Sequence, residues 1–194
     1  MPFSLDVLQA NIGALETSGV DLQGRYGFDV GSGRFDINTA WTYTRKFDVT
    51  PMQLVPENKN RCVGAYGATC GEPIPELKGV TRFSWSMGPF GVSLRHRFID
   101  SVTTDRYVLP KTAGASTVPA LTTFTNPKLD AQNYVDLSFR YDIGDKAEVY
   151  AGVNNVFETD PPIIVGQGGY GNTFPATYDY AGRTFFLGVN VKTF

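Results

Sequence analysis

Apolar and polar residues alternate along several stretches of the chain, and the alternation is clearest between Tyr134 and Ile143. The odd positions carry apolar side chains: Val135, Leu137, Phe139, Tyr141 and Ile143. The even positions carry polar ones: Asp136, Ser138, Arg140 and Asp142. A period of two places these sets on opposite faces of an extended strand, whereas a helix would scatter both around its circumference. This segment is therefore predicted to be a β-strand.

The same alternation recurs elsewhere, in residues 20–30, 35–43, 83–87, 92–98, 149–153 and 185–191. His96 is an exception, because it interrupts the apolar side of its segment. The pattern predicts about seven strands. We expect each to reach the roughly 9–11 residues that a tilted strand needs to cross a bilayer.

Short and long connections alternate between these strands. Gly31-Ser32-Gly33, Gly88-Pro89 and Gly144-Asp145 are typical of tight hairpin turns. Residues 48–76, 101–128 and 157–178 are rich in Pro, Gly, Thr and Asn, and we expect loops there without hidden helices. Outer-membrane barrels have this asymmetry, with tight turns on the periplasmic side and long loops outside.

Two architectures fit strands with one apolar face. In a soluble sandwich the apolar face points inward, whereas in a membrane barrel it meets lipid and the polar face lines the lumen. The loop asymmetry and the aromatic residues near strand ends favour the barrel: Trp41, Tyr43, Trp85, Tyr141 and Tyr150. We therefore expect an all-β, antiparallel up-and-down meander. Its predicted lipid-facing residues are Val135, Leu137, Phe139 and Tyr141.

Composition supports a β protein and excludes some partners. The 194 residues include 21 Gly, 10 Tyr and 14 Phe, and the net charge of -2 with no basic stripe argues against nucleic-acid binding. No run of 18 apolar residues predicts a transmembrane helix. Residues 1–6 have neither the basic start nor the apolar core of a signal peptide, so we expect an export signal upstream.

The two cysteines, Cys62 and Cys70, lie eight positions apart in a Gly- and Pro-rich segment. They are either reduced thiols of a cytosolic protein or a disulfide that closes a loop in an oxidising compartment, and we favour the disulfide. A metal site is not expected, because the lone histidine, His96, lies far along the chain in a strand-like segment.

Three segments resemble a known family. Residues 11–22 (NIGALETSGVDL) are similar to a strand start, and residues 153–162 (VNNVFETDPP) to a penultimate strand with its following loop. Residues 171–179, followed by Gly182-Arg183-Thr184-Phe185-Phe186, are similar to the approach to a final strand. Together with an aromatic last residue, Phe194, they resemble the C-terminal part of TonB-dependent outer-membrane receptors.

This resemblance implies a bacterial outer-membrane location, and it makes residues 1–194 the C-terminal part of a receptor barrel. Such barrels close with about 22 strands, so about seven strands form a partial segment of a large transmembrane β-barrel. The implied partners are outer-membrane lipid, the remainder of the barrel and its plug, and the barrel-assembly machinery. The sequence has no counterpart of the plug or of the motif that binds TonB, so TonB would act through a missing N-terminal region.

The resemblance also assigns a C-terminal assembly signal to Phe194. The alternation of residues 185–191 puts Phe194 on the other face, as if Thr193 were a one-residue insertion or a bulge.

No catalytic site or cofactor site is predicted. His96 lies between Arg95 and Arg97 on a predicted strand, which is more typical of a histidine at the membrane rim than of a catalytic triad. The glycines of residues 166–171 lack the lysine and the following helix of a phosphate-binding loop, so we expect a flexible outer loop there.

What remains is ligand binding by the full receptor, and the resemblance implies an iron chelate, cobalamin or glycan. Aromatic loop residues are candidate ligand contacts, or else they pack the loops against each other: Tyr66, Tyr107, Phe124, Tyr170 and Phe174. Two alternatives stay open, namely a self-standing small outer-membrane protein and a secreted β-sheet binding protein.

Overall fold

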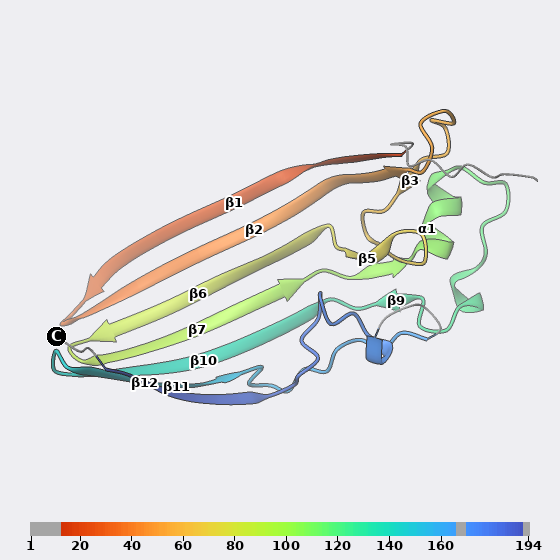
Figure 1. Cartoon of the computed structure of the whole chain (residues 1–194). Helices are drawn as coiled ribbons and strands as arrows, with labels where there is room; N and C mark the ends of the chain where they lie inside the picture. The colour runs from red at the N-terminus through yellow and green to blue at the C-terminus, as the bar shows by residue number, and fades with distance from the viewer. Residues whose placement is uncertain (1–12, 166–169, 192–194) are drawn as a thin grey trace, which may run out of the picture.

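A computed structural model describes residues 13–165 and 170–191 of the chain. Its main feature is one long antiparallel sheet in which strands pair in chain order (Figure 1). The strands of this sheet are β1 (Ala14–Val30), β2 (Gly33–Thr50), β6 (Leu77–Met87), β7 (Phe90–Ile99), β10 (Gln132–Ile143), β11 (Ala147–Asn154) and β12 (Thr184–Val191). The predicted meander of about seven strands is confirmed.

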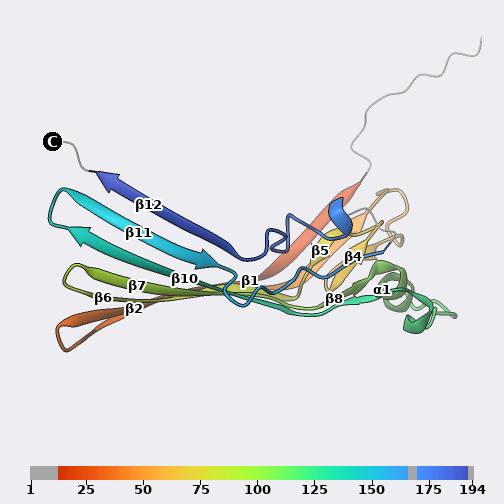
Figure 2. The same ribbon diagram turned by 90° about the horizontal axis from the view of Figure 1, so that it is seen from below.

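The sheet is curved and twisted but open (Figure 2). Among the described strands, β1 pairs with β2 alone and β12 pairs with β11 alone, so the two ends of the sheet do not meet. Each end strand therefore presents a row of backbone N–H and C=O groups on its outer edge.

All three predicted tight turns are confirmed, and they lie together at one end of the sheet (Figure 1). Gly31, Gly88 and Gly144 start these turns with φ of 61°, 54° and 53°. Positive φ is a conformation that glycine adopts without a steric penalty, which explains glycine at each first position.

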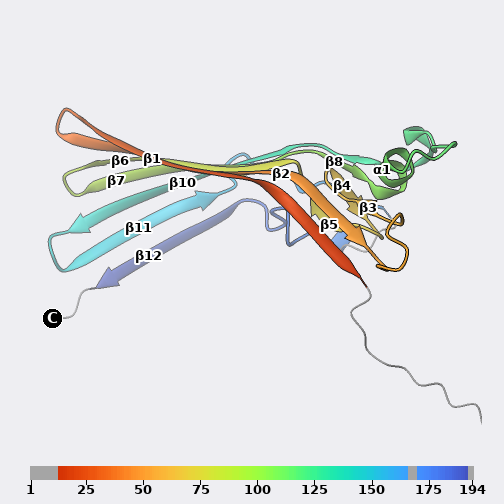
Figure 3. The ribbon, with the colours of Figure 1, turned by 90° about the horizontal axis from the view of Figure 1, so that it is seen from above.

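The opposite end holds the long loops, and these contain more regular structure than the sequence predicted (Figure 3). Short strands form a second sheet in the order β5 (Gly71–Ile74), β4 (Ala65–Gly67), β8 (Val102–Thr104) and β9 (Lys128–Leu129). A further short strand, β3 (Asn60–Arg61), pairs antiparallel with the end of β2. One helix, α1 (Asp105–Thr112), lies among them, with 3-10 turns at Leu121–Thr123 and Tyr170–Asn172.

The expectation that residues 101–128 contain no helix is therefore wrong. The α1 segment contains Pro110, and no side chain caps its start at Thr104, so its sequence carries weak helix signals. A tertiary contact holds it instead. The Asp105 carboxylate, 2% exposed in the first turn, accepts the backbone N–H groups of Thr69 (2.7 Å) and Cys70 (3.1 Å).

The register of the main sheet separates apolar from polar side chains across all seven strands. One cross-strand row is entirely apolar: Tyr26, Ile37, Phe83, Leu94, Leu137, Val153 and Phe185. The next row, on the opposite face, carries mostly small and polar residues: Gly27, Asp36, Ser84, Ser93, Ser138, Gly152 and Phe186. The apolar face is exposed, with Tyr26 65% and Phe185 76% exposed.

The buried core lies under the loops rather than under the sheet. Its members come from the second sheet and from the segment before β12: Tyr66, Val102, Leu129, Ile164, Phe174 and Tyr178. None of the helices in the described ranges is long and apolar enough to cross a membrane.

Candidate functional site

The polar face of the main sheet carries a buried carboxylate where it meets the loops. Asp136 on β10 is 5% exposed and lies opposite Arg95 of β7, whose Nε donates to it at 2.7 Å. Arg97, two residues further along β7 and thus on the same face, donates from Nε and Nη2 at 3.1 Å each. The backbone N–H of Asn155 adds a fourth hydrogen bond at 2.9 Å. Burial removes water from the Asp136 carboxylate, and these four hydrogen bonds replace the lost hydration of its negative charge.

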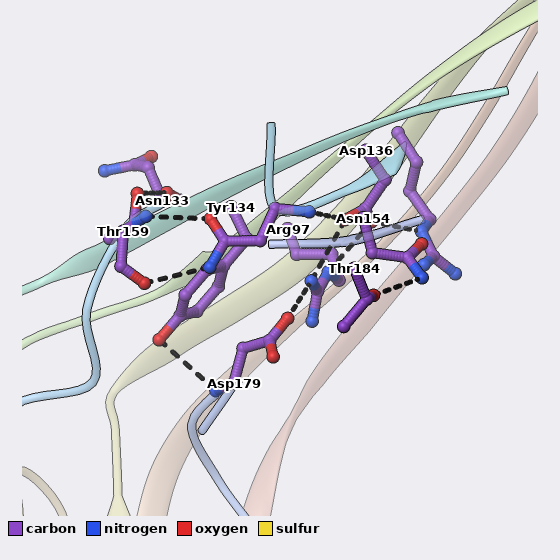
Figure 4. Close-up of polar contacts among 10 residues, drawn as sticks. Arg97, Asn133, Tyr134, Asp136, Asn154, Thr159, Asp179 and Thr184 are labelled. Carbon is purple, nitrogen blue, oxygen red and sulfur yellow. Dashed lines mark hydrogen bonds and ion pairs between the residues drawn. The ribbon is translucent and has the colours of Figure 1, made fainter. Parts of the chain in front are cut away.

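Arg97 also reaches a second carboxylate, which belongs to the loop before β12 (Figure 4). Its Nη2 donates to Asp179 at 2.7 Å, and its guanidinium carbon lies 4.9 Å from the centre of the Tyr134 ring. The backbone N–H of Asp179 donates to the Tyr134 hydroxyl at 3.4 Å. Arg97 therefore ties the segment between β11 and β12 to the polar face of the sheet, and we call this contact the loop anchor.

The start of the same segment is fixed by Asn155, which follows β11 directly. Asn155 is fully buried and has φ of 52°, a conformation that asparagine tolerates better than most residues. Its side chain accepts the Thr159 N–H and donates to the Thr159 carbonyl, both at 2.9 Å. Asn154 donates to the Thr184 hydroxyl at 3.2 Å, across the pair β11–β12. This geometry explains why two asparagines stand in sequence here.

Two of the aromatic residues considered as ligand contacts lie in the loop core. Tyr66 is 3% exposed and Phe174 is 5% exposed, and their rings meet edge to face with centroids 5.7 Å apart. The Tyr66 hydroxyl donates to the Asn126 carbonyl at 2.8 Å. Burial raises the pKa of Tyr66 and that of the neighbouring Tyr178. These side chains hold the loops together, which leaves them little surface for a ligand.

Tyr107 and Phe124 are half-buried and lie beside cations of their own loop. Lys111 Nζ lies 5.5 Å from the Tyr107 ring centre, and the Arg106 guanidinium carbon lies 5.7 Å from that of Phe124. Both aromatics keep some surface toward solvent. The side chain of Tyr170 and the whole of Phe194 fall outside the described part of the structure.

Cys62 and Cys70 are joined by a disulfide with their Cα atoms 5.5 Å apart. The loop that this bond closes is also held by Asp105, through the N–H groups of Thr69 and Cys70. Gly67 has φ of 144°, and a Cβ there would collide with the Asp105 carboxylate, so glycine is required. The disulfide loop and α1 therefore form one packed unit.

The polar face also has an open hollow of about 700 Å³ near its middle. Its polar lining consists of Gln23, Arg25, Asn38, Thr39, Arg82 and Arg95. Among residues 13–165 and 170–191, no three His, Cys, Asp or Glu side chains converge as metal ligands.

Sequence reasoning placed Asp136 on the polar face but missed the loop anchor. The sequence does indicate the pairing of Asp136 with arginines. Neighbouring predicted strands carry opposite charges, Arg95 and Arg97 on one and Asp136 on the other. Nothing in the pattern indicated Asp179, which lies 82 positions from Arg97 and within a loop.

Comparison with known proteins gives one match. The family model described as "TonB dependent receptor-like, beta-barrel" matches residues 3–156, which is most of the chain. No curated protein and no solved structure matches the chain.

Proposed function

This chain belongs to the TonB-dependent receptor-like β-barrel family, and from that membership we propose that it forms part of the wall of a ligand importer. Members of this family are outer-membrane receptors and transporters rather than enzymes. In the proposed role, the outer loops and the polar face bind a scarce solute outside the cell. Energy passed through TonB then releases the solute inward.

The observation that carries this proposal is the exposed apolar face. From Val20 to Val30, β1 rises about 33 Å, which at the usual strand tilt covers the apolar band of about 25 Å of an outer-membrane barrel. Aromatic pairs lie toward both ends of the face, with Trp41–Phe98 at 5.8 Å and Phe90–Tyr141 at 4.8 Å. In this placement the apolar residues of β10 meet lipid, namely Val135, Leu137, Phe139 and Tyr141. The polar residues between them, Asp136, Ser138 and Arg140, face the lumen.

The open edges of β1 and β12 support a place within a larger barrel. Backbone groups on a strand edge cannot be satisfied by lipid, and each unsatisfied group costs several kcal/mol. Further strands of the receptor therefore pair with both edges, up to the roughly 22 strands of this barrel class. A self-standing barrel would need β1 to pair with β12, and within the described strands these two do not pair.

The loop anchor supports a role for the segment between β11 and β12 in solute capture. Arg97 and Tyr134 hold Asp179 against the polar face of the sheet, which in the proposed role is the lumen face. The solute is of the iron chelate, cobalamin or glycan class. The partners are the plug inside the barrel, TonB through a region outside these strands, and the barrel-assembly machinery.

Uptake measurements test this function. A deletion strain is compared with the parent for uptake of a panel of labelled iron chelates, cobalamin and oligosaccharides, each with and without active TonB. We expect loss of uptake of one class, dependent on TonB, and rescue by the gene in trans. Recovery of the protein in the water-soluble fraction, or unchanged uptake of every solute, would contradict the proposal.

A further inference from the structure

The apolar face of the main sheet contains a hollow of about 550 Å³, which we call the apolar hollow. Four strands form it, β6, β7, β10 and β11, and they lie side by side (Figure 1). Apart from Gly91 and Arg140, its lining residues are apolar side chains of this face. A mostly apolar lining and a volume of this size are typical of sites for small molecules.

The register of the strands explains why a hollow forms at this place. One cross-strand row of the apolar face reads Trp85, Val92, Phe139 and Ala151, so that small side chains follow large ones. Trp85 and Phe139 are two strand spacings apart, which is about 10 Å, with the smaller Val92 between them. Val92 and Ala151 therefore form the floor, and the two aromatic side chains form the walls.

A second row closes the hollow on the side of the tight turns. Phe90 of β7 lies opposite Tyr141 of β10, and their ring centroids are 4.8 Å apart. Phe90 is 54% exposed and Phe139 is 53% exposed, so both rings project from the sheet surface. The apolar hollow is therefore bounded by aromatic rings on more than one side.

The place of the hollow within the sheet separates it from the rest of the receptor. In the proposed placement the apolar face points away from the lumen, so the plug inside the barrel does not reach it. The strand β6 also pairs with β2, and β11 also pairs with β12. Strands that pair with the outer edges of β1 and β12 therefore do not border the hollow.

The depth of the hollow indicates what fills it. Phe90 directly follows the tight turn Gly88-Pro89, and Val92 lies two residues further along β7. At about 3.3 Å per residue, the floor of the hollow is within roughly 10 Å of this turn. The tight turns of outer-membrane barrels face the periplasm. The hollow therefore lies at the depth of the inner leaflet, and an aromatic ring such as Tyr141 is typical of that boundary.

We propose that the apolar hollow binds an acyl chain of one inner-leaflet phospholipid and retains this lipid while neighbouring lipids exchange. The proposal rests on the barrel-wall placement above and adds a defined lipid site to it. Within a bilayer the hydrophobic effect does not favour the hollow over the surrounding lipid. Retention comes instead from van der Waals contacts, because a chain between Trp85 and Phe139 touches protein on several sides.

Native mass spectrometry of the intact receptor, after exchange into detergent, tests this site. We expect the wild type to retain at least one phospholipid. Val92→Phe and Ala151→Phe fill the floor of the hollow, and each should reduce the amount of this retained lipid severalfold. Val153→Phe is the matched control, since Val153 lies two residues along β11 on the same face and outside the hollow. Equal retention in all four proteins, or equal loss in Val153→Phe, would overturn the site.

Photo-cross-linking then shows where the retained lipid lies. A photoreactive benzoyl derivative of phenylalanine replaces Phe139 in one receptor variant and Phe185 in another, because Phe185 shares the apolar face but lies outside the hollow. In native membranes both positions should form phospholipid adducts. After detergent exchange, only the variant at position 139 should still form one. Cross-links from position 139 to a second receptor copy or to another protein would overturn the proposal.

These results are separate from the uptake panel. A receptor that imports its solute through TonB, yet retains no phospholipid in the wild type, would refute the lipid site and leave the importer function standing. A protein recovered in the water-soluble fraction would refute both.

Discussion

At the scale of single residues, Arg97 and Asp136 make most of the hydrogen bonds of the loop anchor. Asp136 accepts hydrogen bonds from two arginines and one backbone amide, and Arg97 joins that carboxylate to Asp179. A buried ion pair is not a strong source of stability in itself, because desolvation offsets the attraction. Removing one partner is costly, however, because the other charge remains buried without compensation.

Arg97→Gln is therefore expected to destabilise the loop end of the sheet by about 3 kcal/mol. The segment between β11 and β12 should become sensitive to protease, while the tight-turn end stays protected. Lys128→Gln is the control, since Lys128 and Asp130 form an exposed pair at 3.5 Å whose loss costs at most about 1 kcal/mol. Equal protease sensitivity of the two variants would contradict the role of the anchor.

The buried tyrosines of the loop core predict a pH dependence. Burial raises the pKa of the Tyr178 hydroxyl above its usual value, and this hydroxyl has no hydrogen-bond partner among the described residues. The unfolded tyrosine ionises near pH 10, so the stability from keeping it neutral is complete below about pH 10 and is lost as pH rises above it.

Tyr178→Phe should leave stability at pH 8 unchanged or slightly higher, because it removes an unpaired buried hydroxyl. It should also shift the alkaline loosening of the loops to higher pH. Limited proteolysis between pH 8 and 12 measures both effects, with Tyr180→Phe as the control because Tyr180 is 67% exposed. Identical alkaline profiles for the wild type and Tyr178→Phe would refute this explanation.

At the scale of elements, the strands follow from the sequence and the loop structure does not. A period-two pattern such as that of residues 134–143 determines the strand and its faces, because each residue turns its side chain to the side opposite its neighbours. The helix α1 and the second sheet depend on contacts between distant residues, such as Asp105 with the amides of Thr69 and Cys70. The local pattern of apolar and polar residues does not predict such contacts.

The same limit applies to the candidate site. From the sequence, aromatic residues on polar loops are equally consistent with ligand contact and with packing between loops. The structure shows that Tyr66 packs against Phe174. The loop anchor required knowledge that Asp179 returns to the sheet, which only the folded chain provides.

Substitutions on the two faces of β10 should differ sharply. Leu137→Arg puts a charge on the face proposed to meet lipid, at a cost of about 2–4 kcal/mol near the midplane. Ser138→Arg, one residue along and on the polar face, should be nearly neutral. Refolding of the receptor into lipid bilayers measures both. Equal harm from the two substitutions would mean that the face assignment is wrong.

The disulfide loop offers a further element-scale prediction. Replacing both Cys62 and Cys70 by Ser releases a short closed loop, at a cost of about 2–3 kcal/mol. Because Asp105 binds the amides of Thr69 and Cys70, α1 should loosen together with the loop. Hydrogen exchange of residues 62–70 and 105–112 measures this coupling. Unchanged protection of α1 in the double variant would show that the two do not act as one unit.

At the scale of the whole molecule, the described strands form an open section of a barrel wall and do not enclose a lumen by themselves. Their core lies under the loops, their exposed face is apolar, and both sheet edges are open. The exposed apolar face and the open edges are unfavourable for this sheet alone in water, and both are satisfied within a larger barrel in a membrane. The sheet without its neighbouring strands is therefore expected to associate edge to edge.

The central claim is that one face of this wall meets lipid and the other meets the lumen. Spin labels placed singly at positions 135–143 in the receptor, in native outer membranes, test it most directly. The account predicts a period of two, with labels at odd positions accessible to oxygen and labels at even positions accessible to a water-soluble nickel reagent. Uniform accessibility to the nickel reagent, or alternation in the opposite phase, would contradict the account.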